Sequence, residues 1–135
     1  MIKHIRTSGQ LPCLYFAFGR KRTEELAWEE IHFDFMTSVE REAALKTFDE
    51  LCEKFELKKE PSAHEMRRLV QRGIAFHHAG MLPTLKEVIE RLFTSKHVKL
   101  IFTTETFALG INMPAKAVIF DELRKFNGIG FGFLR

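Results

Sequence analysis

The sequence predicts an α/β domain in which helices cover both faces of a parallel sheet. Four short apolar runs, each bounded by turn-forming or charged residues, are typical of buried strands. They are Leu11–Phe18, Gly73–His77, Val98–Phe102 and Ala117–Phe120. Helical patterns lie between the runs and the junctions are short, which favours strands that run parallel to one another.

Four helices are expected, with ends marked by capping residues. Their predicted ranges are Arg20–Phe35, Ser38–Leu57, Ala63–Gln71 and Pro83–Thr94. Thr37–Ser38 offers N-cap side chains for the second helix, and Ser62 with Glu65 has the spacing of a capping box for the third. Gly73 is expected to end the third helix, and Pro83 suits the first turn of the fourth.

The composition bounds the class of protein. The 135 residues are 45% hydrophobic, with a net charge of +3 and a pI near 9.0, which fits one domain over residues 1–135 with a mildly basic surface. Cys13 and Cys52 lack metal-ligand spacing, and Cys13 lies inside a strand, where a thiol is a poor nucleophile. No apolar run reaches transmembrane length and no signal-peptide core follows Met1, so we expect a soluble, intracellular and most simply cytoplasmic protein.

The segment between the last two predicted strands carries a pattern that suggests anion binding. Thr104 and Thr106 follow a strand at the point where a short helix can start, and free backbone N–H groups at such a start favour an anion. Gly110 is expected to close this helix, and Asn112 and Pro114 to turn the chain back toward the sheet. A capped turn without a ligand is the alternative.

The string TETFALGINMPA, Thr104–Ala115, resembles motif V of the Ski-type superfamily 2 helicases, which are DExH-box enzymes that move along RNA or DNA. The resemblance extends to Arg72–Phe93 and to Phe16–Arg20, so it covers most of the chain, loosely before Gln71 and closely after it. It implies the second RecA-like domain of such an enzyme, with motifs IV to V present. Members of the family usually have a serine at the position of Gly19.

The resemblance also implies a function for the complete enzyme. Such an enzyme hydrolyses ATP, with Mg²⁺, between this domain and an N-terminal RecA-like domain, and pulls a single strand of RNA or DNA in the 3′ to 5′ direction, with RNA favoured. The residues implied to contact the nucleic-acid backbone are Arg20, Lys21, His78, Ala79, Gly80, Thr104, Glu105 and Thr106. Those implied to face the ATP cleft and couple the two sites are Gly110, Ile111 and Asn112.

Two of these groups can also be considered on physical grounds. Arg20 and Lys21 place positive charge at a helix N-terminus, which the helix dipole disfavours unless an anion shares the site; a solvated basic helix start is the alternative. His77 and His78 point to opposite faces of an extended segment, so we expect no metal ion between them. His78 can donate to phosphate while Gly80 allows close approach. A capped turn with one buried histidine is the alternative.

Sequence signals for the chemical step are missing. The chain has no G-x-x-x-x-G-K-[ST] phosphate loop, so Asp121–Glu122 is expected to be non-catalytic and to hold no Mg²⁺. Motif VI, which supplies the arginine finger in the family, would follow Arg135. We therefore expect a fragment whose sheet is incomplete at the C-terminal end, without catalytic residues or ATPase activity of its own. The alternative function is a non-enzymatic helicase-like module that binds a protein partner. A Rossmann-type cofactor enzyme is disfavoured because no glycine fingerprint follows the first strand.

Overall fold

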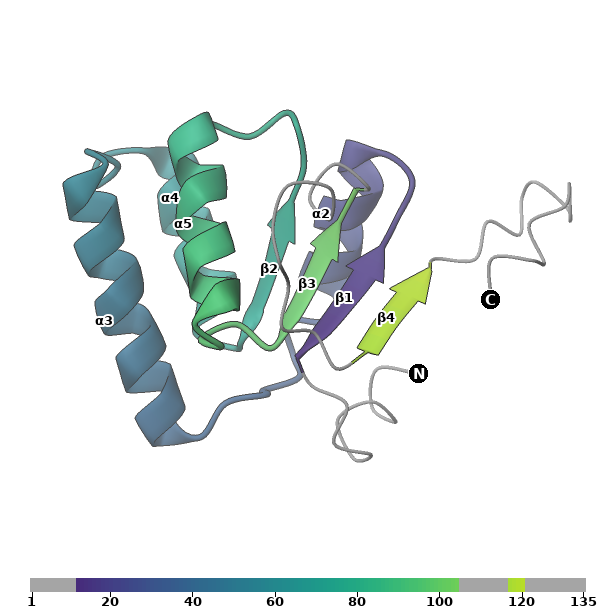
Figure 1. The fold of residues 1–135 in the computed structure, drawn as a ribbon, viewed down its shortest axis with the longest axis horizontal. Coiled ribbons are helices and arrows are strands. Elements are labelled where there is room, and N and C mark those ends of the chain that lie inside the picture. The colour runs from purple at the N-terminus through teal and green to yellow at the C-terminus, as the bar shows by residue number, and fades with distance from the viewer. Residues whose placement is uncertain (1–11, 105–116, 121–135) are drawn as a thin grey trace, which may run out of the picture.

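The computed structural model describes residues 12–104 and 117–120, and its four strands form one parallel sheet in the order β2-β3-β1-β4 (Figure 1). In chain order the elements are β1 (Cys13–Phe16), α2 (Arg20–Glu29), α3 (Ser38–Lys54), α4 (Pro61–Val70), β2 (Ile74–His77), α5 (Pro83–Thr94), β3 (Leu100–Thr103) and β4 (Ala117–Phe120). The predicted α/β class is confirmed.

Helices lie on both faces of the sheet. Figure 1 shows α5 beside β2 and α2 behind β3 and β1, with α3 farthest from the sheet. Helix α2 packs on β2 and β3, whereas α3 packs on α4 and α5. Helices α4 and α5 also pack on β2, so this strand is covered by three helices.

The core is centred on β3. Leu100, Ile101 and Phe102 are each at most 1% exposed, because β3 lies between β2 and β1 and α2 packs on it. Burial on both faces explains why this strand is continuously apolar and does not alternate. Five residues of α5 complete this core on one side: Leu85, Val88, Ile89, Leu92 and Phe93.

Helix α2 ends at Glu29, so the predicted range Arg20–Phe35 was too long. After Glu29 the chain forms turns, and the Phe35 N–H donates to the Arg72 carbonyl at 3.1 Å. Ile31 and Phe33 lie in these turns and Phe35 follows them, so the three side chains do not continue the face of α2.

The helix caps agree only in part with the expectations. The Thr37 hydroxyl accepts the Glu40 N–H at 3.1 Å and the Glu40 carboxylate accepts the Thr37 N–H at 2.9 Å, which confirms an N-cap at Thr37. The predicted capping box of Ser62 with Glu65 was wrong, because α4 begins at Pro61, two residues before the predicted start at Ala63, and its N-cap is Glu60. Proline is favoured at a first helical position and fixes that start.

Candidate nucleic-acid interface

The carboxyl ends of β1, β2 and β3 meet at one edge of the sheet. Phe16 and His77 are both in register with Thr103, and these three residues end their strands. The Ala17 N–H donates to the Thr103 carbonyl at 2.9 Å, and the Thr104 N–H donates to the His77 carbonyl at 3.3 Å. The three following turns therefore share an edge, as predicted, and ligands of open α/β sheets bind at such edges.

Helix α2 starts at this edge without a side-chain cap. Its N-cap is Gly19, with φ +98°, and the first turn contains no acidic residue. Arg20 and Lys21 are both exposed there. Positive side chains beside the positive end of a helix repel it, and an anion bound at this end would relieve that repulsion.

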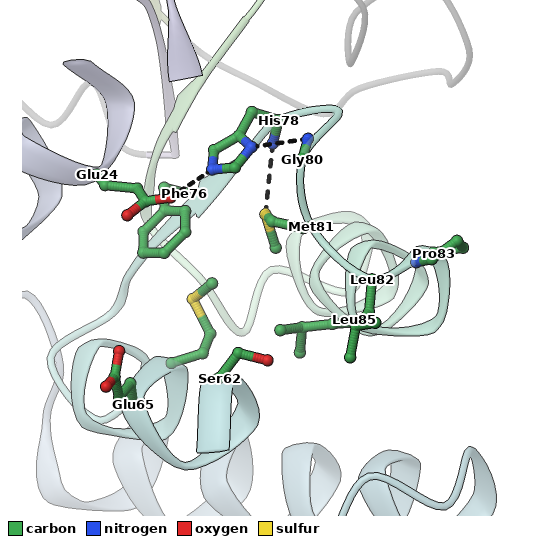
Figure 2. A pocket seen from close by; sticks show the side chains of 11 residues that line it. Glu24, Ser62, Glu65, Phe76, His78, Gly80, Met81, Leu82, Pro83 and Leu85 are labelled. Atoms are coloured by element: carbon green, nitrogen blue, oxygen red, sulfur yellow. Dashed lines mark hydrogen bonds and ion pairs between the residues drawn. The ribbon is translucent and has the colours of Figure 1, made fainter. Parts of the chain in front are cut away.

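The loop after β2 is held by the side chain of His78. Its Nε2 lies 2.6 Å from the Glu24 carboxylate of α2, and its Nδ1 lies 3.0 Å from the Gly80 N–H (Figure 2). The imidazole is only 5% exposed, and the parallel Phe76 ring lies 5.7 Å away. Both ring nitrogens therefore have partners inside the protein.

Gly80 leaves room for its neighbours at this edge. A Cβ at Gly80 would lie 3.2 Å from Cδ of Arg20 and 3.2 Å from Nδ1 and Cε1 of His78. The start of α2 and the loop after β2 are thus in close contact. Thr104, joined to His77 by its backbone, is the third part of this cluster.

His77 points the other way and is buried against α5. Its Nε2 lies 2.8 Å from the Glu90 carboxylate. Burial, with smaller contributions from the charges of Lys86 and His78, lowers the pKa of His77 to about 3, and burial raises the pKa of Glu90. The imidazole is therefore neutral at pH 7 and its Nε2–H donates to Glu90. The two histidines face opposite sides, as predicted, but both are buried.

Other reactive groups in the described residues do not form a catalytic site. Burial raises the pKa of Cys13 to about 12 and that of Cys52 to about 11, so neither thiol is an activated nucleophile at pH 7. Within residues 12–104 and 117–120, no three His, Cys, Asp or Glu side chains are grouped so that they could hold a metal ion. None of the helices described is long and apolar enough to cross a membrane.

Known proteins similar to this chain are helicases, although no family model matches it. Mouse Superkiller complex protein 2 is 40% identical over 134 residues, which are 97% of this chain and 11% of that protein. Human Exosome RNA helicase MTR4 is 40% identical over 136 residues, covering 99% of this chain and 13% of that protein. Antiviral helicase SKI2 of Saccharomyces cerevisiae is 39% identical over 135 residues, covering 96% and 10%.

Identity of about 40% along nearly the whole chain establishes homology to these proteins. The chain is homologous to a segment of the Ski2 and MTR4 helicases. Similar proteins from Arabidopsis thaliana bear the name DExH-box ATP-dependent RNA helicase, in agreement with the Ski-type, DExH-box resemblance. The chain spans only about a tenth to an eighth of the length of these relatives.

Not every predicted contact residue of this helicase-like segment lies among the described residues. Arg20, His78, Ala79, Gly80 and Thr104 are brought to one edge, and Lys21 lies at the same helix start. Glu105 and Thr106, and the predicted cleft residues Gly110, Ile111 and Asn112, lie outside the described residues. The nucleic-acid contacts of all these residues stay predictions.

Sequence reasoning missed the two carboxylates that hold the histidines. The sequence patterns assign no role to either Glu24 or Glu90. One signal for Glu24 was available, because it follows Arg20 by four residues and so lies on the same face of α2. No local pattern pointed to its partner His78, which is 54 residues away.

Proposed function

We propose that this chain is the main part of the second RecA-like domain of an ATP-dependent RNA helicase. Its homology to proteins named RNA helicases, at 37% to 42% identity, carries this proposal. The clustering of Arg20, Gly80 and Thr104 at the carboxyl edge of the sheet supports it. These residues come from three separate turns, and a phosphate backbone crossing this edge could contact all three.

The proposed contacts are to the backbone of the strand. The exposed Arg20 guanidinium supplies a charged donor, the exposed Ala79–Gly80 backbone allows close approach, and the Thr104 hydroxyl supplies a neutral donor. Contacts of this kind position a strand without reading its bases, so we expect little dependence on RNA sequence. Because the imidazole of His78 is already bonded on both sides, we assign its role to the loop backbone and not to a direct phosphate contact.

The complete enzyme would use this domain as one wall of its ATP cleft. We propose that ATP and Mg²⁺ lie between this wall and an N-terminal RecA-like domain, and that Gly110, Ile111 and Asn112 connect the cleft to the RNA contacts. The chain itself contains no phosphate-loop sequence, so we assign no catalytic residue to it.

A salt titration of RNA binding tests the proposed grip. Fluorescence anisotropy with labelled oligo(A) and oligo(U) should show weak binding of the chain to both. Each phosphate contact should add about 0.7 to the slope of log K against log salt. Arg20→Ala should lower that slope by about 0.7. Lys46→Ala, which removes the same charge from an exposed position on α3, should leave it unchanged. Equal slopes for both variants, or no binding by the wild type, would contradict the proposal.

A further inference from the structure

The Glu24–His78–Gly80 contacts form a continuous link from helix α2 to the loop after β2. Gly80 donates its backbone N–H to Nδ1 of His78, so Nδ1 must be the unprotonated nitrogen. The ring hydrogen of the neutral imidazole is then on Nε2, where it donates to the Glu24 carboxylate at 2.6 Å. A single tautomer satisfies both bonds.

The ring has little freedom to leave this arrangement. It is 5% exposed and stacks on Phe76 with an angle of 8° between the ring planes. The Met81 N–H donates to the His78 carbonyl at 3.2 Å, and the His78 N–H points to the Met81 sulfur at 3.4 Å. Figure 2 shows the bonds from Glu24, Gly80 and the Met81 sulfur meeting at His78. The position of the turn that contains Gly80 therefore depends on the position of the His78 ring.

Helix α2 contacts the loop after β2 at two points, through Arg20 and through Glu24. Arg20 lies against Gly80, and Glu24, one helical turn later, holds the ring that holds Gly80. Glu24 thus fixes the distance between a charged donor and the loop backbone, although its own negative charge makes it unsuited to contact phosphate.

We propose that Glu24 and His78 are a positioning pair that sets the Ala79–Gly80 backbone against Arg20 for nucleic-acid binding. This inference rests on the proposed function of the edge. Glu24 acts through His78 and touches no nucleic acid. Its loss lets the ring and the turn shift, and the contacts of Arg20 and Gly80 with one strand no longer form together.

Electrostatics and positioning predict opposite effects for Glu24. Removing a carboxylate beside a phosphate-binding edge should tighten RNA binding if only charge matters. If Glu24 positions the loop, the same change should weaken binding. The neighbouring Glu25 is exposed and supplies the matched control, since Glu25→Ala removes the same charge from the same helix.

The test is RNA binding by the 135-residue chain and its variants at low salt, measured by anisotropy with labelled oligo(A). Glu24→Ala should raise the Kd about fivefold relative to Glu25→Ala, and Glu24→Gln, which keeps an acceptor for Nε2–H, about twofold. The Glu24 side chain is 45% exposed and borders an open pocket of about 290 Å³, so its truncation leaves no enclosed cavity. A Kd for Glu24→Ala equal to or below that of Glu25→Ala would overturn the proposal.

A second variant and a second readout separate positioning from general destabilisation. His78→Asn keeps an acceptor near the Nδ1 position but cannot reach Glu24, so Glu24→Ala should add nothing to its Kd. Hydrogen exchange at the Gly80 amide should accelerate at least about fivefold in Glu24→Ala, with β3 amides unchanged. If the wild type binds no RNA, the proposed function fails, while Gly80 exchange still decides whether Glu24 holds the loop. Unchanged Gly80 exchange would refute the link itself.

Discussion

His77 should make the stability of this protein fall between pH 7 and pH 5. Its imidazole is buried, and its pKa drops from 6.5 to about 3 on folding, chiefly because burial disfavours the charged ring. In the unfolded chain the His77 imidazole therefore binds a proton below about pH 6.5, whereas in the folded chain it stays neutral down to about pH 3. The contribution is fully present above the unfolded pKa and is lost as pH falls toward the folded pKa.

The size of the effect follows from this difference. At pH 5 the unfolded imidazole, with its pKa of 6.5, is about 1.5 units below its midpoint, while the folded imidazole is still neutral. At about 1.4 kcal/mol per unit, the folded state loses about 2 kcal/mol between pH 7 and pH 5. Glu90 acts in the opposite direction, because its raised pKa makes the folded state hold a proton more firmly as pH falls.

The measurement is the free energy of unfolding in urea at pH 7 and pH 5 for the wild type and His77→Gln. Glutamine keeps an N–H near the Nε2 position but does not titrate, and Glu90 and the remaining histidines are common to both proteins. The variant should lose about 2 kcal/mol less than the wild type over this interval. His32→Gln removes an exposed imidazole and serves as the control. Equal losses in the wild type and His77→Gln would show that His77 takes up a proton in the folded protein, and the reasoning would be wrong.

Three further outcomes are expected. Gly73→Ala should cost about 2–4 kcal/mol of unfolding free energy, because Gly73 has φ +83° and a Cβ there would lie 3.0 Å from Met36. In urea unfolding, the double variant with Met36→Ala should recover part of that loss. A cost below about 1 kcal/mol would contradict the prediction. Thr104→Val in a complete helicase should lower RNA-stimulated ATPase and unwinding while RNA-free ATPase and Tm stay nearly constant; a fall in Tm with unchanged stimulated turnover would make Thr104 a structural cap. The isolated chain should release no phosphate from ATP with Mg²⁺ and poly(A), and turnover above buffer that Thr104→Val abolishes would refute this.

The strands and the shared edge could be predicted because their signals are local. The strand Ile74–His77 differs by one residue from its predicted range, and helix Pro83–Thr94 has the predicted bounds. Continuous apolar runs report burial on both faces, and a proline at the first helical position marks a helix start. Parallel strands then bring the turns after them to one edge without any further information.

The predicted end of α2 was wrong because apolar residues with a spacing of two were included in a helix, whose faces repeat every 3.6 residues. Ile31, Phe33 and Phe35 are apolar, and the helix pattern before them was extended to include them. The structure places Phe35 in the core, 8% exposed, just after the turns that follow α2. The spacing of two residues was the available signal, since it does not fit the 3.6-residue period of a helix face.

The partners of the two histidines could not be predicted for a different reason. Glu24 and His78 meet only after α2 and β2 pack together, and no periodicity links positions 54 residues apart. Each residue taken alone has an ordinary local explanation: a glutamate on a helix surface, and a histidine at a strand end. Pairing is a property of the packed fold, and it changes the roles of both residues.

The parts of this edge are held together by tertiary contacts, and RNA binding is expected to depend on them. Gly19 provides no hydroxyl to cap α2, and the helix start carries Arg20 in place of an acid. Among the described contacts, those that fix the start of α2 relative to the loop are tertiary, from Glu24 to His78 and from Arg20 to Gly80. A peptide copied from either segment therefore lacks the other half of the edge, and must order itself without these contacts before it can bind a strand. The grip proposed here belongs to the packed α2 and β2 elements together, so changes that loosen their packing should weaken RNA binding even where no contact residue is altered.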